Sequence, residues 1–202
     1  CGQIGAAVDL AWGVTKGRDD VLIAVLDSGI RWGDPGSMAD LAKNAYLNPG
    51  EARPKASPPN GDANGDGRFD LDDFGPLFDR NGNGVSDPED LILDPAYNNG
   101  IDDDGNGYVD DVNGWDFLND DKTPFDGVKD DHATHVSGTI GQDTNNQVAE
   151  AGIAYNATIM PLKACLGYWD VQFTMSSLGV TGYAPLNAGG CSAGAVAAAV
   201  RY

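Results

Sequence analysis

The sequence predicts an α/β fold in which helices pack on a parallel β-sheet. Residues 21–26 form an unbroken apolar run rich in β-branched residues, which is typical of a strand buried on both faces of a parallel sheet. Residues 157–164 predict another strand. Predicted helices at residues 131–141 and 192–202 alternate with these strands, and this order of elements indicates a layered α/β architecture.

The composition sets limits on the class of protein. The chain has 202 residues, of which 41% are hydrophobic, so it can bury a core as one domain or as a domain with a small insert. No apolar run reaches the roughly 18 residues that a membrane span needs. The net charge of −19 argues against nucleic acid and anionic membranes as partners. Because neither end carries the features of a natural terminus, we expect residues 1–202 to be part of a longer protein.

The first half of the chain has few regular elements. We expect a helix over residues 5–16, which is followed by a turn before the first strand. Residues 33–60 are rich in Gly, Pro and Asn and predict a loop. An acidic segment at 61–113 comes next, and residues 112–118 predict a second, short strand.

The second half carries the stronger signals. Asp130 or Asp131 can cap a helix that runs to about Gly141. The strand at residues 157–164 contains Pro161, which cannot donate a ladder hydrogen bond. A long connection at residues 165–191 then leads to the last helix.

Most of the negative charge lies in one segment. Residues 60–131 contain 21 acidic and four basic residues, which gives −17 of the total of −19. Such a block repels itself unless cations neutralise it. A solvated acidic loop, or polar turns without metal, would be the simplest interpretation, but Asp and Asn recur there at fixed spacing and alternate with Gly.

The spacing matches twelve-residue calcium loops, with side-chain oxygens at positions 1, 3, 5, 9 and 12, Gly at position 6 and a backbone carbonyl at position 7. Ca²⁺ prefers about six to eight oxygen ligands, and this pattern supplies them. The first copy offers Asp62, Asn64, Asp66, Arg68, Asp70 and Asp73, and the second offers Asp79, Asn81, Asn83, Val85, Asp87 and Asp90. The third copy offers Asp102, Asp104, Asn106, Tyr108 and Asp110 but has Asn113 at position 12. Because the twelfth residue is Asp in the full copies, the loops resemble those of dockerins and thrombospondin type 3 repeats. We therefore predict a rigid, calcium-binding insert at residues 60–113.

Two further positions suggest catalysis. Asp27 ends the first strand, and α/β sheets place their sites at the carboxyl ends of strands. His132 and His135 are the only histidines and lie three residues apart on a predicted helix. Each also has a simpler interpretation, since Asp27 could be a loop carboxylate and either histidine a packed core residue. A zinc site is a further alternative, although the Glu of a His-Glu-x-x-His motif is absent.

Taken together, these motifs resemble one family. Residues 23–30 (Ile-Ala-Val-Leu-Asp-Ser-Gly-Ile) and 132–139 (His-Ala-Thr-His-Val-Ser-Gly-Thr) are similar to the Asp and His motifs of the subtilisin-like serine peptidases, the subtilases. Residues 152–163 and 192–202 look like the following family segments, and residues 99–117 look like an insert of bacterial members.

The resemblance implies a three-layer subtilisin-like fold with a central parallel sheet, truncated at its C-terminus. It also implies a serine-type endopeptidase that acts on proteins or peptides, with Asp27 and His132 in an Asp-His-Ser triad. Two departures stand out. Ala133 replaces the usual Gly, and no Gly-Thr-Ser-Met-Ala block with the nucleophile is present. We expect the nucleophile beyond Tyr202, do not assign that role to Ser192, and expect the 202 residues alone to be inactive.

The three cysteines bear on the compartment. Cys165 and Cys191 lie at the two ends of one long connection. We therefore predict a disulfide between them, with two free thiols as the alternative. We assign no role to Cys1. A disulfide, calcium loops and the family resemblance together predict a secreted, extracellular protein. The Asn156-Ala157-Thr158 sequon would matter only in a eukaryotic host.

Two rival functions stay open. A non-enzymatic extracellular calcium-binding adhesion or spacer module predicts that Asp27 and His132 lie far apart. A phosphatase-type hydrolase that uses Asp27 as nucleophile would need a second Asp at the position of Gly29, so we disfavour it. The sequence indicates neither the oligomeric state nor the peptide specificity.

Overall fold

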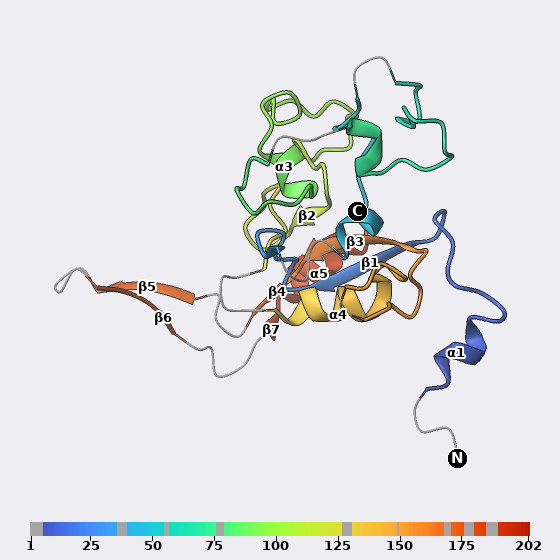
Figure 1. Cartoon of the computed structure of the whole chain (residues 1–202). Helices are drawn as coiled ribbons and strands as arrows, with labels where there is room; N and C mark the ends of the chain where they lie inside the picture. The colour runs from blue at the N-terminus through green and yellow to red at the C-terminus, as the bar shows by residue number, and fades with distance from the viewer. Residues whose placement is uncertain are drawn as a thin grey trace.

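The computed structural model describes residues 6–35, 40–54, 57–75, 79–126, 131–148, 150–167, 171–175, 180–184 and 190–202. At its centre, three parallel strands lie in the order β1-β3-β2 (Figure 1). These are β1 (Leu22–Asp27), β3 (Thr158–Lys163) and β2 (Trp115–Asp116). The sheet confirms the predicted α/β class with a parallel sheet. Cys1 and Asp130 lie outside the described residues.

Pro161 is tolerated inside the central strand because of its position in the ladder. The backbone N–H groups of Thr158 and Ala164 both donate to the β1 side, at Val21 O and Asp27 O. Since these groups alternate between the two sides of a strand, the nitrogen of Pro161 points away from β1. On that side, β2 begins only opposite Leu162. The missing donor therefore leaves the β1–β3 ladder intact.

Two helices cover opposite faces of the sheet. These are α4 (His132–Gly141) and α5 (Ala193–Ala199). One cluster joins Ile23, Val25 and Ile159 to Val136 and Ile140 of α4, and another joins Leu26, Met160 and Leu162 to Ala199 of α5. Because side chains alternate between the two faces of a strand, these clusters lie on opposite sides. The described part therefore has three layers, helix, sheet and helix.

The N-terminal helix is shorter than predicted. Instead of residues 5–16, α1 covers only Val8–Ala11 and contains no buried residue. Short helices are marginal in water unless packing stabilises them, and Gly13 ends this one after a single turn. The indole of Trp12 nevertheless anchors the segment, since its Nε1 donates to Ile153 O over 2.9 Å.

The later helices begin close to their predicted starts. Helix α4 has Asp131 at its N-cap position, but the Asp131 side chain makes no capping hydrogen bond. The backbone carbonyl of Asp131 instead accepts from His135 N at 2.8 Å. Helix α5 is capped by Ser192, whose Oγ accepts from Ala195 N at 3.3 Å.

The acidic segment is built mostly of turns and lies beyond the edge of the sheet that β2 forms (Figure 1). It contains a 3₁₀ turn, η2 (Leu71–Phe74), and a short helix, α3 (Pro88–Ile92). Each begins with a reciprocal capping box, formed by Asp70 with Asp73 and by Asp87 with Asp90. The preceding loop contains one further 3₁₀ turn, η1 (Ala42–Asn44).

The connection at residues 165–191 is more structured than predicted. Strands β5 (Val171–Met175) and β6 (Val180–Ala184) form an antiparallel pair that extends away from the sheet (Figure 1). At its base, β4 (Cys165–Leu166) pairs with β7 (Gly190–Cys191). The alternation of apolar and polar residues over 171–175 is the sequence signal that predicts such a strand. Among the described residues, none of the helices is long and apolar enough to cross a membrane.

We expect Ser137→Ala to raise the free energy of unfolding by about 1 kcal/mol. Ser137 lies in α4 and is fully buried, and its Oγ has no hydrogen-bond partner among the described residues. An alanine removes this unsatisfied hydroxyl and favours the helix. Urea unfolding of the two proteins measures the difference, and a less stable alanine variant would show that the hydroxyl has a partner.

Candidate active site

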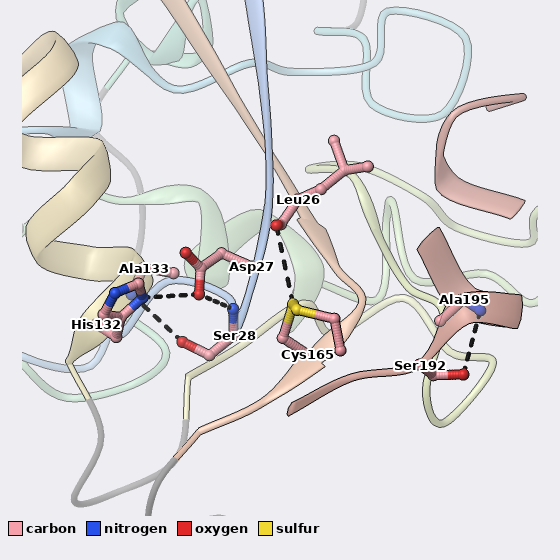
Figure 2. The surroundings of a disulfide bond; sticks show 9 residues. Leu26, Asp27, Ser28, His132, Ala133, Cys165, Ser192 and Ala195 are labelled. Carbon is pink, nitrogen blue, oxygen red and sulfur yellow. Dashed lines mark hydrogen bonds and ion pairs between the residues drawn. A yellow bond between two sulfur atoms is a disulfide. The ribbon is translucent and has the colours of Figure 1, made fainter. Parts of the chain in front are cut away.

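The structure brings Asp27 and His132 together. Asp27 ends β1, and His132 is the first residue of α4. His132 Nδ1 lies 2.9 Å from Asp27 Oδ1, which also accepts from Ser28 N at 2.7 Å (Figure 2). This distance lies within hydrogen-bond reach, as the Asp-His pair of a triad requires. The side chain of His132 is 70% exposed and that of Asp27 is 20% exposed, so the imidazole is accessible on one side and held on the other.

The turn after Asp27 leaves no room for a side chain at Gly29. Its φ is 102°, and a Cβ there would lie 2.5 Å from Pro124 O. A second carboxylate at this position, as the phosphatase-type alternative needs, would not fit. Ser28 joins the turn to α4, because its Oγ accepts from Ala133 N at 3.3 Å (Figure 2). Ala133 is buried and accommodated, so its methyl group does not displace His132.

The other candidate side chains have different roles. His135 is exposed on α4 and lines a cavity of about 500 Å³ beside this helix. Within the described ranges, the carboxylate and imidazole groups close enough to share a metal ion are Glu51, Asp102 and Asp104, and neither histidine is among them. The zinc alternative therefore has no support from the geometry. Ser192 serves as the cap of α5.

A disulfide lies near Asp27 and His132. Cys165 is bonded to Cys191, which confirms the predicted bridge. The Cys165 Sγ lies 3.9 Å from the carbonyl oxygen of Leu26, the residue before Asp27 (Figure 2). The bridge thus pins the base of the β5–β6 pair beside this end of the sheet.

The first two acidic loops have the same internal geometry. In the first, the position-12 carboxylate of Asp73 accepts from the backbone N–H groups of positions 2, 3 and 9, at 2.6, 3.1 and 2.9 Å. In the second, Asp90 accepts from the same three positions, at 2.7, 3.4 and 3.2 Å. The position-7 residues Arg68 and Val85 each donate a backbone N–H to the side chain at position 5 over 2.8 Å.

The third loop repeats this geometry with a residue from outside the loop. Glu51 Oε1 accepts from the N–H groups of Asp103 and Asp104, and Glu51 Oε2 accepts from Asp110 N, at 2.8, 3.2 and 3.1 Å. These are positions 2, 3 and 9, which Asp73 and Asp90 hold in the other loops. Glu51 therefore stands in for the missing twelfth residue. Glu51 belongs to no sequence motif and was not predicted, although Asn113 at position 12 is a signal that a carboxylate from elsewhere could fill this position.

Asn113 and Asp110 are engaged outside the third loop. Asn113 is fully buried and accepts from Trp32 Nε1 at 3.0 Å. The Asp110 carboxylate accepts from Lys122 Nζ at 2.6 Å and from Asn99 N at 2.9 Å. Burial raises the pKa of Asp110, but these donors outweigh it and lower the pKa below its ordinary value.

Asp111 takes the place expected for Asp110. Asp111 Oδ2 accepts from Asn106 Nδ2 at 2.9 Å, and Asp87 Oδ2 likewise accepts from Asn83 Nδ2 at 2.7 Å. Asn106 and Asn83 both occupy position 5. The carboxylate that faces the third loop at this point is therefore that of Asp111.

Several carboxylates of these loops are buried, which raises their pKa values. Burial raises the pKa of Asp87 to about 6, although Asn81 and Asn83 donate hydrogen bonds to it. Burial likewise raises the pKa values of Asp70, Asp111 and Glu51. Gathering carboxylates in this way favours protonation unless a cation is bound.

Asp40 is another buried carboxylate whose charge is not fully compensated by the described residues. It is fully buried, its Oδ1 accepts from Asn146 Nδ2, and its Oδ2 has no hydrogen-bond partner in the described parts of the chain. Burial raises the Asp40 pKa, and the nearby carboxylates of Asp143 and Glu150 raise it further. An oxygen-seeking cation would satisfy this carboxylate, so its chemistry fits calcium.

Comparisons with known proteins point to one family. Residues 18–181 match the model of the subtilase family. Over 65 residues, 32% of the chain, the sequence is 42% identical to subtilisin-like protease 1 of Plasmodium falciparum (isolate 3D7) and of Plasmodium vivax, and 37% identical to that of Plasmodium berghei (strain Anka). The match spans only 9–10% of the length of these relatives. Since the family match covers most of the sequence and includes both Asp27 and His132, the chain belongs to the subtilase family.

Proposed function

We propose that this chain supplies the Asp and His of a serine-type endopeptidase that cleaves protein or peptide substrates. The contact between His132 Nδ1 and Asp27 Oδ1 at 2.9 Å is the observation that carries the proposal. The nucleophilic Ser and the oxyanion donors would come from a segment outside the 202 residues. The adhesion-module alternative expects the two side chains far apart, so the observed contact favours the peptidase.

In the proposed reaction each group has its own role. Asp27 Oδ1 accepts the Nδ1–H of His132, so in the neutral imidazole Nε2 carries no proton and can act as a base. As the Ser hydroxyl attacks the peptide carbonyl, Nε2 takes its proton, and Asp27 stabilises the imidazolium that forms. The imidazolium then gives the proton to the leaving amine, and the acyl-enzyme remains. Water then attacks the acyl-enzyme with the same proton transfers through His132, which releases the acid product and regenerates the Ser hydroxyl.

The test uses the longer protein that contains this chain. It should hydrolyse casein and be labelled at one Ser by a fluorophosphonate probe, and both activities should be lost in His132→Ala. Labelling and hydrolysis that survive in His132→Ala would refute the assignment. A parent protein that binds calcium but shows no hydrolysis would favour the adhesion module.

We also propose that the acidic insert at residues 60–113 binds Ca²⁺. The support is the shared geometry of the three loops and the elevated pKa values of their buried carboxylates. In the third loop, the proposed donors are Asp102, Asp104, Asn106, the Tyr108 carbonyl, Asp111 and Glu51. Asp110, which is engaged with Lys122, is not among them. Together with the Cys165–Cys191 disulfide, these loops support a secreted, extracellular protein.

We expect Glu51→Gln to weaken the binding of one calcium ion by at least about tenfold, which is roughly 1.4 kcal/mol. The amide keeps the size of the side chain but removes a negative charge and one oxygen ligand. Titration calorimetry measures the number of ions and their affinities. Asp73→Asn and Asp90→Asn should each weaken a different ion, whereas Asp9→Asn on α1 should change none. Unchanged binding in Glu51→Gln would rule out its role as a ligand.

A further inference from the structure

Lys163 is the one buried cation among the residues that the structure describes. It is the last residue of β3 and is 7% exposed. Burying an ammonium group costs several kcal/mol unless charged and polar partners surround it. A lysine in this position therefore has specific partners, and these partners indicate its role.

The sheet register places Lys163 between two carboxylates. Lys163 pairs with Asp27 of β1 on one side and with Asp116 of β2 on the other. Residues in register on adjacent parallel strands project from the same face, so all three side chains lie on one face of the sheet. Because Val25 and Asp27 alternate with Leu26, this is the face that α4 covers. Burial raises the Asp116 pKa, and the charge of Lys163 opposes that rise.

The ammonium group also holds a segment that lies over the turn after Asp27. Lys163 Nζ donates to Phe125 O over 2.7 Å. We call residues 124–126 the strap. The strap is bonded to Ile30 at two points, since Ile30 N donates to Pro124 O at 3.0 Å and Asp126 N donates to Ile30 O at 3.3 Å. A Cβ at Gly29 would collide with it, so the strap lies in direct contact with the turn.

The same strap reaches the helix that carries His132. Thr134 Oγ1, in the first turn of α4, donates to Asp126 Oδ2 at 3.5 Å and accepts from Arg31 N at 3.0 Å. The strap thus contacts both the turn that follows Asp27 and the helical turn that begins at His132. A shift of the strap would change the separation of these two side chains.

We propose that Lys163 is a positioning residue for the Asp27–His132 pair, which it holds in register by fixing the strap at Phe125 O. Lys163 touches neither the substrate nor the proton that moves, and it acts through the backbone of residues 124–126. The inference rests on the proposed peptidase function for its kinetic consequence. The geometric consequence can be measured separately.

The kinetic test compares Lys163→Met with Lys163→Arg in the longer protein. Lys163→Met should lower kcat by roughly 10- to 100-fold with KM little changed, because a small misplacement of catalytic groups costs about that much. Lys163→Arg, which keeps the charge and the donor, should recover part of the loss. Arg18→Met is the matched control, since it removes an exposed cation at the opposite end of β1. A fall in kcat that matches only the unfolded fraction, or an equal fall in Lys163→Arg and Lys163→Met, would overturn the proposal.

Proton NMR tests the geometry without turnover. The Nδ1–H of His132, bonded to Asp27, should give a downfield resonance that shifts or broadens in Lys163→Met and not in Arg18→Met. Thr134→Val breaks the link of the strap to α4 and leaves Lys163 in place, so it should shift the His132 resonance in the same direction. This variant replaces Lys163→Met in the test if Lys163→Met does not fold. An unmoved resonance in the folded variants would overturn the positioning role. A wild-type protein with this resonance but no hydrolysis would instead contradict the proposed function alone.

Discussion

Replacing Asp27 by Asn is expected to lower kcat of the longer protein by roughly 10⁴-fold, with KM little changed. The amide nearly matches the carboxylate in size, so the fold should persist. An amide NH₂ facing His132 Nδ1 would favour the tautomer that carries its proton on Nε2. That nitrogen could then no longer accept the Ser proton, and the amide would not stabilise an imidazolium.

Steady-state hydrolysis of a peptide substrate measures this effect. Asp20→Asn is the control, because Asp20 is an exposed carboxylate just before β1 that pairs with Arg18. His132→Ala should cost at least as much as Asp27→Asn, and the double variant should cost little more than His132→Ala alone, since the two groups act as a unit. A loss of less than tenfold in Asp27→Asn would contradict the triad assignment.

Removing calcium should lower the melting temperature of the protein by about 10–30 °C. Each site held at 100 times its dissociation constant contributes about 2.7 kcal/mol, and two to three sites contribute about 5–8 kcal/mol. For a protein of this size, 1 kcal/mol shifts the melting temperature by about 2–4 °C. The physical reason is that carboxylates are gathered and buried in these loops, and burial raises the pKa of Asp87 to about 6.

Calorimetry with calcium and with excess chelator measures this shift, and magnesium at the same concentration controls for ionic strength. Magnesium should restore little stability, because it demands a small octahedral site and dehydrates reluctantly. Melting temperatures that agree within about 2 °C, with and without chelator, would show that the loops are polar turns without metal.

The sequence was sufficient to predict the central sheet and its helices. The apolar run that becomes β1 supplies side chains to the apolar clusters on both faces of the sheet, and this is a local pattern. The helix predicted at 5–16 was wrong in extent, because no packing stabilises α1 beyond one turn. The strands within 165–191 were missed because a short alternating run inside a Gly-rich stretch was taken for a loop.

For the site, contacts within a repeated motif could be predicted from spacing, whereas contacts between distant segments needed the family resemblance or the structure. Asp27 and His132 lie 105 positions apart, and only the family resemblance connected them before the structure did. Glu51 reaches its loop over 52 or more positions and belongs to no motif. Asp110 and Asp111 are adjacent carboxylates. The loop spacing alone pointed to Asp110, but in the structure Asp110 accepts from Lys122, and Asp111 is the carboxylate that faces the loop.

The register of β1 with β3 has a consequence for the rate of folding. Leu22 pairs with Thr158, which is 136 positions further along the chain. Closing a flexible loop of that length costs about 4 kcal/mol of chain entropy before the first ladder bond forms. Such a topology predicts slow folding, with exposed apolar strands that are prone to aggregation in the meantime. An insert that collapses around calcium would shorten the effective loop, so calcium should act on the rate at which the sheet assembles as well as on its final stability.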